Sequence, residues 1–346
     1  MMPHLLFEHL MSAIHSNTSR TNTHYLHPAQ KDWIDDLRTR LLWRWELPTW
    51  LLIITIYSAW FGLVLFWADL NIYWATPVWI FLTAWYMSLQ HELIHGHPTR
   101  FKRLNQLFGT APLAVWYPYG LYRDTHIAHH IDENITHPHL DPEAYYLSSQ
   151  AYQNLPSVLQ AFMDFHNTFF GRLVFGPAVA IVQTFWGMLK SFYQLDIAAI
   201  TMWLIHFGLL AILLHFLNQH GINPFYFVGV IAYPALSLTM VRSFNEHRAE
   251  HAPEARSVIN EAGWFWRLLF LNLNYHVLHH DLPHLPWYGL RRVYLAYRAE
   301  YVARAQGFVL SGYTALAYQY AYQPVIEVVH PFESTTASIR PTTASA

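Results

Sequence analysis

The sequence predicts an all-α integral membrane protein with four transmembrane helices in two hairpins, interfacial helices and a cytoplasmic cap. Hydrophobic residues make up 53% of the 346 residues and charged residues only 12%, about half the charged share of soluble domains. Charged residues are nearly absent from residues 45–99 and 191–241. This composition excludes a disordered or nucleic-acid-binding chain. The lack of cysteine excludes disulfides, iron–sulfur clusters and thiolate zinc sites.

Each of the two stretches contains two apolar runs separated by a short polar turn. The four runs cover residues 47–67, 72–90, 197–217 and 224–241. At about 1.5 Å per residue, a helix of about 20 residues is roughly as long as the hydrocarbon core of a bilayer is thick. Buried helices of a large soluble protein would instead show amphipathic faces. We therefore expect all four runs to span a membrane.

The distribution of Lys and Arg predicts the orientation in the membrane. The two turns, residues 68–71 and 218–223, contain neither residue. The opposite ends of the runs carry many of them: Lys31, Arg38, Arg40, Arg44, Arg100, Lys102, Arg103, Arg242 and Arg248. Positive residues are retained on the cytoplasmic side of a membrane. We therefore expect an inner-membrane protein with both termini in the cytoplasm.

Three other apolar segments are expected to lie along the membrane surface: residues 104–122, 173–189 and 264–273. The first of them could also be a re-entrant segment. The first is interrupted by Gly109, Pro112 and Pro118, and the third contains Arg267. Residues 173–189 are just long enough to span. A crossing there, however, would put the histidine motifs described below on opposite sides of the membrane.

The sequence predicts one folded domain, residues 45–330, that carries these helices and the histidine motifs. Residues 1–44 are expected to form a cytoplasmic N-terminal arm, and the Ser/Thr-rich residues 331–346 a disordered tail. Residues 281–330 are expected to form a cytoplasmic cap with a helix near residues 290–304.

Histidine is the most unusual feature of the composition, with 24 residues. His91 and His95 are spaced i, i+4 at the end of the second apolar run, on one face of a helix. Two further segments have the pattern HxxHH: His126, His129 and His130, and then His276, His279 and His280. Chance would give roughly 0.1 such patterns in a chain of this composition. We therefore interpret these groups as metal ligands on the cytoplasmic face.

The number and type of ligands narrow the choice of metal. Imidazole suits zinc, copper, iron and nickel. Eight or nine histidines are too many for one tetrahedral zinc ion, which takes four ligands, but they suit two metal ions. Iron activates oxygen against unreactive C–H bonds, and a membrane enzyme meets such bonds in acyl chains.

The three motifs resemble those of the integral-membrane fatty acid desaturase and hydroxylase superfamily, including bacterial fatty acid desaturases. The matching segments are HELIH (91–95), HIAHH (126–130) and HVLHH (276–280), and the resemblance covers about residues 45–300. It implies two non-haem iron ions, O₂ as co-substrate and electrons from an external ferredoxin or cytochrome. The ligands that it implies are His91, His95, His126, His129, His130, His276, His279, His280 and a ninth, His247, with His251 as the alternative to His247.

Other residues near the motifs are candidates for supporting roles. Metal-bound imidazoles need a partner for their second nitrogen; the candidates are Glu92, Asp124, Asp132, Glu133, Asp141, Glu246, Asn272 and Asn274. His97 and His284 flank the motifs. His206 lies in mid-membrane, where a hydrogen bond to a neighbouring helix is favoured over a place in the wall of an acyl tunnel. Four basic residues are candidates to bind an acyl head group: Lys102, Arg123, Arg242 and Arg248.

We therefore expect an O₂-dependent membrane oxidoreductase that introduces a double bond into a fatty acyl chain. Sister reactions at the same centre remain open: fatty acid hydroxylation, carotenoid ketolation or hydroxylation, and decarboxylation of a fatty acid to a terminal alkene. A histidine-rich metal transporter is a more remote alternative, because it would place histidines or carboxylates at mid-membrane on several helices.

Overall fold

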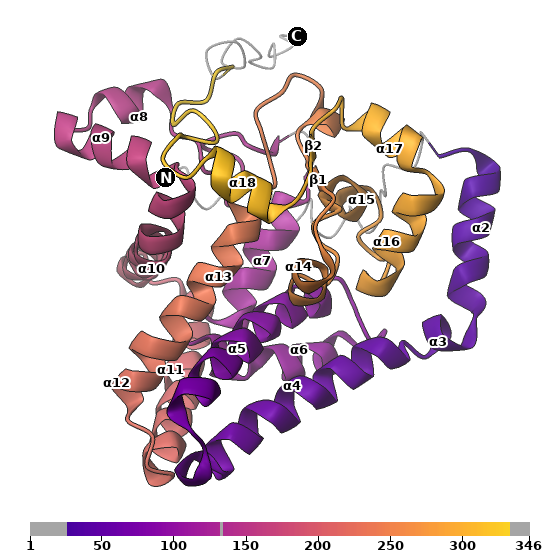
Figure 1. Ribbon diagram of the computed structural model, residues 1–346. Coiled ribbons are helices and arrows are strands. Elements are labelled where there is room, and N and C mark those ends of the chain that lie inside the picture. Colours follow the sequence, from indigo (N-terminus) through magenta and orange to yellow (C-terminus); the bar gives the residue numbers. More distant parts are fainter. Residues whose placement is uncertain (1–25, 132–133, 333–346) are drawn as a thin grey trace, which may run out of the picture.

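Helices dominate residues 26–131 and 134–332, which the computed structural model describes (Figure 1). Long helices extend from a cap of shorter helices and loops. Among the described residues, the named strands are β1 (Ile259–Asn260) and β2 (Val309–Leu310), a short parallel pair inside the cap. This architecture confirms the predicted all-α fold.

The bounds of the helices follow the chain. The α-helices are α2 (Pro28–Thr39), α3 (Leu41–Arg44), α4 (Leu47–Leu65), α5 (Ile72–Ile94), α6 (Lys102–Thr110), α7 (Tyr119–His129), α8 (Ser149–Gln153), α9 (Ser157–His166), α10 (Phe169–Tyr193), α11 (Ile197–Gln219), α12 (Pro224–Tyr226), α13 (Tyr233–Ser243), α14 (Trp264–Leu269), α15 (His276–Asp281), α16 (Trp287–Ala296), α17 (Arg298–Arg304) and α18 (Tyr313–Gln319). A π-helical turn, Phe227–Ala232, joins α12 to α13 without a break. Short 3-10 turns occupy Trp67–Asp69, Pro112–Ala114 and Pro253–Ala255.

Polar side chains at the turns explain where the long helices begin. Asn71 caps α5, since its side chain accepts a hydrogen bond from Tyr73 N at 2.9 Å. Asp196 caps α11 in the same way, through Ala199 N at 3.0 Å. Each cap satisfies a backbone N–H that has no partner within the helix.

In the part of the chain that the structure describes, four helices are long and apolar enough to cross a membrane: α4, α10, α11, and the continuous α12–α13 segment Pro224–Ser243. Three of them match predicted spans. The remaining predicted span, residues 72–90, lies in α5, which has 23 residues. Helix α5 is less apolar than the other four because it contains several Trp, Tyr and Thr residues and Pro77.

Helix α10 is the main difference from the sequence-based expectation. Residues 173–189 lie within a continuous apolar helix of 25 residues, which is long enough to cross the membrane. Its first half packs on α13, where Tyr233 Oη donates a hydrogen bond of 2.7 Å to the carbonyl of Val174. The length and composition of α10 fit a membrane crossing. The interfacial placement expected for residues 173–189 therefore gains no support and stays a prediction.

Two shorter apolar segments are broken, as their sequence suggests. Residues 104–122 divide into α6, a 3-10 turn and the start of α7, with the breaks at the prolines. In residues 264–273 only α14 is helical. It rests on α5, where Trp85 Nε1 donates to the carbonyl of Leu268 at 2.9 Å.

The cap includes more of the N-terminus than predicted. Residues 28–44, expected to belong to the arm, form α2 and α3. Trp33 of α2 packs edge-on against Tyr297, with ring centroids 5.6 Å apart. The helix predicted near residues 290–304 is two helices, α16 and α17, with Tyr297 between them. Residues 1–25 and 333–346, including most of the predicted tail, lie outside the described residues.

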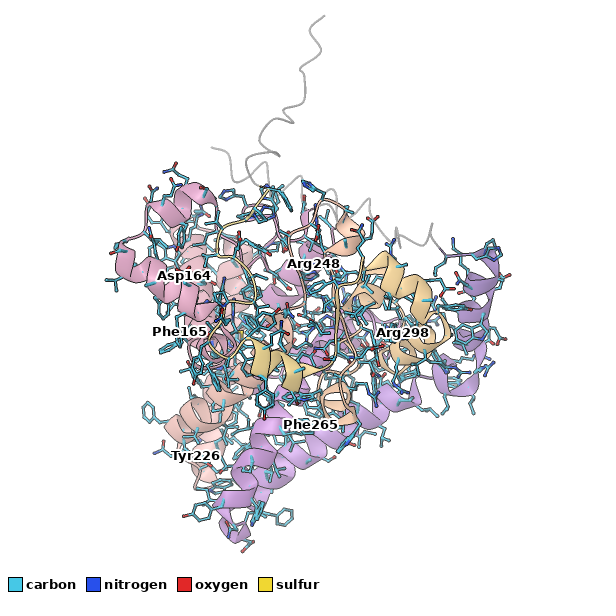
Figure 2. All side chains as sticks on the ribbon, turned by 45° about the horizontal axis from the view of Figure 1, so that its top comes forward. Asp164, Phe165, Tyr226, Arg248, Phe265 and Arg298 are labelled. Atoms are coloured by element: carbon cyan, nitrogen blue, oxygen red, sulfur yellow. The ribbon has the colours of Figure 1, made fainter. Side chains whose placement is uncertain are left out.

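The residues labelled in Figure 2 show the two ends of the molecule. In Figure 2 the labelled Asp164, Arg248 and Arg298 lie in the cap, whereas Tyr226 lies at the far end of the long helices.

Trp60 connects three of the helical segments in the core. It is fully buried, and its ring centroid lies 5.3 Å from Trp79 and 5.5 Å from Phe227. Trp60 thus holds α4 and α5 against the π-helical turn.

We expect the Trp60→Ala variant to lose about 3–5 kcal/mol of stability, because it leaves a large cavity where these helices meet. The measurement is the apparent melting temperature of the purified protein in detergent. The matched control is Trp74→Ala, because Trp74 is 77% exposed and its removal leaves no cavity. Equal melting temperatures for the two variants would contradict this account of the core.

Candidate metal centre

All nine predicted ligand histidines converge where helix ends meet the cap. His91 lies in the last turn of α5 and His95 directly follows that helix. The HxxHH patterns lie on α7 and α15, with His130 directly after α7. Helical spacing of i, i+3 and i+4 turns the members of each motif toward one side. The motifs therefore face one another from three segments, and His247 joins them from the segment after α13.

Eight of these histidines form two groups of four. The first group is His91, His95, His126 and His279, and the second is His129, His247, His276 and His280; in each group the ligand atoms lie within 4.8 Å of one another. In the first, Nε2 of His95 lies 3.0 Å from Nε2 of His126. In the second, Nε2 of His247 lies 2.9 Å from that of His129 and 3.0 Å from that of His276.

His130 lies between the two groups. Its Nε2 is 3.1 Å from Nε2 of His126 and 3.1 Å from Nε2 of His279, both in the first group. Its ring stacks on His280 of the second group, with centroids 4.3 Å apart. His251, the alternative to His247, lies elsewhere, with its ring 4.0 Å from that of Phe332.

The nitrogen atoms are arranged as metal ligands are. Zinc-type sites hold imidazole nitrogens about 2.0–2.1 Å from the ion, so two ligands of one ion lie up to about 4 Å apart. Both groups approach that spacing. His91 is 1% exposed, and neither of its ring nitrogens has a hydrogen-bond partner among the described residues. Since buried polar atoms are almost always paired, the donor set fits a bound metal ion.

Carboxylates and a hydroxyl contact the second nitrogen of several of these rings. Nδ1 of His129 lies 2.8 Å from Asp141 Oδ1, and Nδ1 of His126 lies 3.2 Å from Glu143 Oε1. The remaining contacts are His276 Nδ1 to Glu246 Oε1 at 3.1 Å and His247 Nδ1 to Ser257 Oγ at 3.2 Å. Such partners fix the orientation of a ligand ring and make it a better donor.

Two of these partners, Asp141 and Glu246, were candidates from the sequence, whereas Glu143 and Ser257 were not. Glu143 had a recognisable signal, since it lies two residues beyond Asp141 in the same short segment after the second motif. Ser257 had none, because an antiparallel bridge between His247 and Ser257 brings it to the site.

The other candidate partners make different contacts. Glu92 accepts a hydrogen bond from Trp287 N at 2.8 Å, and Asp124 pairs with Arg123 at 2.7 Å. The side-chain amides of Asn272 and Asn274 donate to the backbone carbonyls of Trp287 and Asn260. Asp132 and Glu133 lie outside the described residues.

The remaining histidines near the motifs have structural contacts. His97 is buried, with Nδ1 2.7 Å from Glu46 Oε1, and His284 Nδ1 lies 3.4 Å from the carbonyl of His95. His206 Nε2 lies 2.8 Å from the carbonyl of Val115. The partner lies just after the 3-10 turn Pro112–Ala114, so His206 makes a hydrogen bond as expected, but to a loop instead of a helix.

Burial sets the charge state of most of the cluster. Burial lowers the pKa of His247, His276 and His279, which keeps these imidazoles neutral and able to bind a metal. His129 differs. Burial acts to lower its pKa, but the carboxylates of Glu143 and Asp141 outweigh this effect and raise the pKa to about 9.

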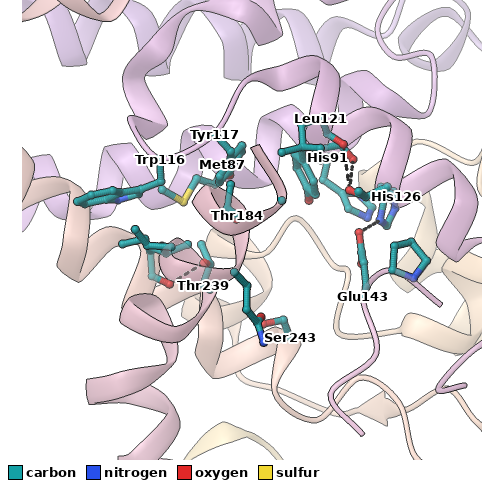
Figure 3. Close-up of a pocket in the computed structure, with 18 of the residues that line it drawn as sticks. Met87, His91, Trp116, Tyr117, Leu121, His126, Glu143, Thr184, Thr239 and Ser243 are labelled. Atoms are coloured by element: carbon teal, nitrogen blue, oxygen red, sulfur yellow. Dashed lines mark hydrogen bonds and ion pairs between the residues drawn. The ribbon is translucent and has the colours of Figure 1, made fainter. Parts of the chain in front are cut away.

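A cavity of about 500 Å³ reaches both histidine groups. In Figure 3, His91 and His126 lie at one end, next to Glu143, and Trp116 lies toward the other. The lining includes His276 of the second group as well. Away from the histidines many of the walls are apolar, with Trp203, Ile181 and Leu236 among them.

The comparison with known families agrees with the histidine motifs. The family model for fatty acid desaturases matches residues 78–310, which include all three motifs and His247. The chain belongs to the fatty acid desaturase family. No curated protein matches the chain. Membership makes this protein a membrane oxidoreductase with a lipid or fatty acyl substrate, and it leaves the metal-transporter alternative without support.

We expect the Asp141→Asn variant to bind metal about 10- to 100-fold more weakly, because His129 loses the carboxylate that orients its ring. The measurement is the iron content of the purified protein after dialysis against graded concentrations of a chelator. Asp124→Asn is the matched control, since Asp124 pairs with Arg123 instead of a histidine of the site. Unchanged iron retention in Asp141→Asn would contradict this role.

We also expect ferrous iron to displace a proton from His129 at pH 7. Its pKa of about 9 means that the ring is protonated at this pH in the metal-free protein, whereas only the neutral ring binds a metal. Calorimetric titration in two buffers of different ionisation enthalpy measures the proton release. Asp141→Asn should release fewer protons, and equal release by both proteins would overturn this assignment.

Proposed function

We propose that this protein is an O₂-dependent desaturase of fatty acyl chains that holds two iron ions in its two histidine groups. The observation that carries the proposal is the cavity, which ends on His91, His126 and His276, members of both groups. Ligand cavities typically have volumes of about 300–1,000 Å³ with mainly apolar walls. An acyl chain fits such a cavity, with one segment of the chain beside the histidines.

Each group of four histidines would hold one ion, with His130 between the two. Iron bound there would supply the activation of O₂ that an unreactive C–H bond requires. The chain's own residues would perform the positioning. Asp141, Glu143 and Glu246 would keep the ligand rings in place, and the apolar walls would hold one methylene pair at the centre.

The proposed reaction needs electrons from outside the protein. Desaturation removes two hydrogen atoms from neighbouring methylenes, while O₂ is reduced to two molecules of water. The balance requires two further electrons and two protons. We propose a separate donor of the ferredoxin or cytochrome type, which would dock on the cytoplasmic face of an inner-membrane protein.

The same centre would support the sister reactions, because the product depends on which C–H bond faces the metal. Fatty acid hydroxylation and decarboxylation to a terminal alkene are therefore alternative outcomes of the experiment below, and carotenoid ketolation or hydroxylation stays open beside them.

The experiment is gas chromatography–mass spectrometry of a bacterial host that expresses the chain, covering fatty acids, hydroxy acids and headspace hydrocarbons. We expect new unsaturated acyl chains with the unmodified protein, and none with His276→Ala or His247→Ala. His251→Ala is the matched control and should retain the product, since its ring lies against Phe332 and outside both groups.

The alternatives give distinct results. A hydroxy acid or a terminal alkene in place of the unsaturated chain would keep the iron centre and overturn the desaturase assignment. A purified protein that binds no iron would overturn the proposed function as a whole. We expect two iron ions per chain.

A further inference from the structure

The cavity contains one permanently charged cation. Of the basic residues considered for binding a head group, Arg242 lines the cavity, and it is the one Lys or Arg among the described lining residues. Arg123 pairs with Asp124 at 2.7 Å. Arg248 donates to the carbonyl of Ala255 at 3.2 Å, and Lys102 opens α6. The structure therefore singles out Arg242.

Arg242 is placed directly beside the metal centre. It lies in the last turn of α13, and its side chain is 11% exposed. Its Nη1 donates to Glu246 Oε1, and that oxygen lies 3.1 Å from Nδ1 of His276. One carboxylate thus separates the guanidinium from a histidine of the second group.

The guanidinium has more donors than this contact uses. Arginine has five N–H donors in a planar fork that matches the two oxygens of a carboxylate. The side-chain hydrogen bonds of Arg242 to other described residues use Nη1 alone. Because a buried charge needs partners, the remaining donors, at the wall of the cavity, suit an anionic group of the ligand.

The nearby carboxylates do not rule out an anion at this position. Glu143 and Glu246 each contact a histidine Nδ1, at 3.2 and 3.1 Å, and Asp141 contacts His129 at 2.8 Å. Two divalent ions together with Arg242 would outweigh these three negative charges. A carboxylate entering the loaded site would therefore meet a net positive field.

We infer that Arg242 binds the carboxylate of an unesterified fatty acid at the metal end of the cavity. The chain then lies carboxyl end first, with its tail among the apolar walls formed by Trp116, Ile181 and Trp203. The carbons nearest the carboxyl group face the centre, so oxidation falls on the first few carbons rather than in mid-chain. This inference rests on the proposed function, and it names the substrate class and the end of the chain that reacts.

The test is the binding of terminally brominated undecanoic acid and of its methyl ester to the iron-loaded full-length protein in lipid nanodiscs. Bromine quenches tryptophan fluorescence at short range, and Trp116 and Trp203 line the apolar part of the cavity. We expect the acid to bind more tightly than the ester. The Arg242→Gln variant should bind the acid about 10- to 100-fold more weakly, as expected for a lost charged hydrogen bond, and the ester equally well.

Two further variants separate head-group binding from structure. Arg242→Lys keeps the charge but loses the planar fork, so its affinity for the acid should fall between those of the unmodified protein and Arg242→Gln. Arg123→Gln removes an arginine that pairs with Asp124 outside the cavity and should change nothing. If Arg242→Gln fails to fold, the comparison of acid and ester in the unmodified protein and in Arg242→Lys decides the question.

Equal affinities for acid and ester in the unmodified protein would overturn the inference, as would an equal loss of both in Arg242→Gln. A product oxidised in mid-chain would also overturn it. These failures leave the proposed function intact if the protein contains iron, whereas a protein without iron would fail the proposed function itself.

Discussion

The structure depends on bringing nine imidazoles from four separate segments into one buried cluster. Imidazoles packed this closely, with several nitrogen pairs near 3 Å, cannot all donate and accept hydrogen bonds to one another. The arrangement is favourable when metal ions occupy the space between them and carboxylates hold the outer nitrogens. Two of the segments lie at or just after the ends of the long helices α5 and α13, and the other two lie at α7 and α15. Cap and helices must therefore fold together.

The carboxylate partners depend on a part of the chain far away in sequence. Asp141 and Glu143 lie in the loop that follows the second motif, and Asp141 Oδ2 also accepts from Thr136 N at 2.9 Å. The C-terminal segment, residues 320–332, closes over this loop. Leu147 forms a parallel bridge with Val329 there, and His330 lies 3.3 Å from Thr136. Residues outside the family match at 78–310 thus support the centre.

Much of the fold and most of the site could be predicted from sequence. Apolar runs of fixed length show where long helices occur, and histidines at helical spacing show which side chains share a face. Glu143 lies two residues beyond Asp141 and could have been predicted. Ser257 and the position of His130 between the two groups could not, because contacts between distant segments bring them into place. The cavity is a property of packing among helices α5, α7, α10, α11 and α13, and no local pattern encodes it. Helix α10 extends beyond the apolar residues 173–189 at both ends, because the neighbouring aromatic and polar residues continue the helix.

The π-helical turn between α12 and α13 has a consequence for the orientation of everything after it. Such a turn accommodates one extra residue without breaking the helix. Each residue turns an α-helix by about 100°, so the π-helical turn, Phe227–Ala232, sets the rotational phase of α13. Without the extra residue, Arg242 on α13 would point about a quarter-turn away from the cavity. A single residue of backbone in this turn therefore controls how α13 is aligned with the metal centre.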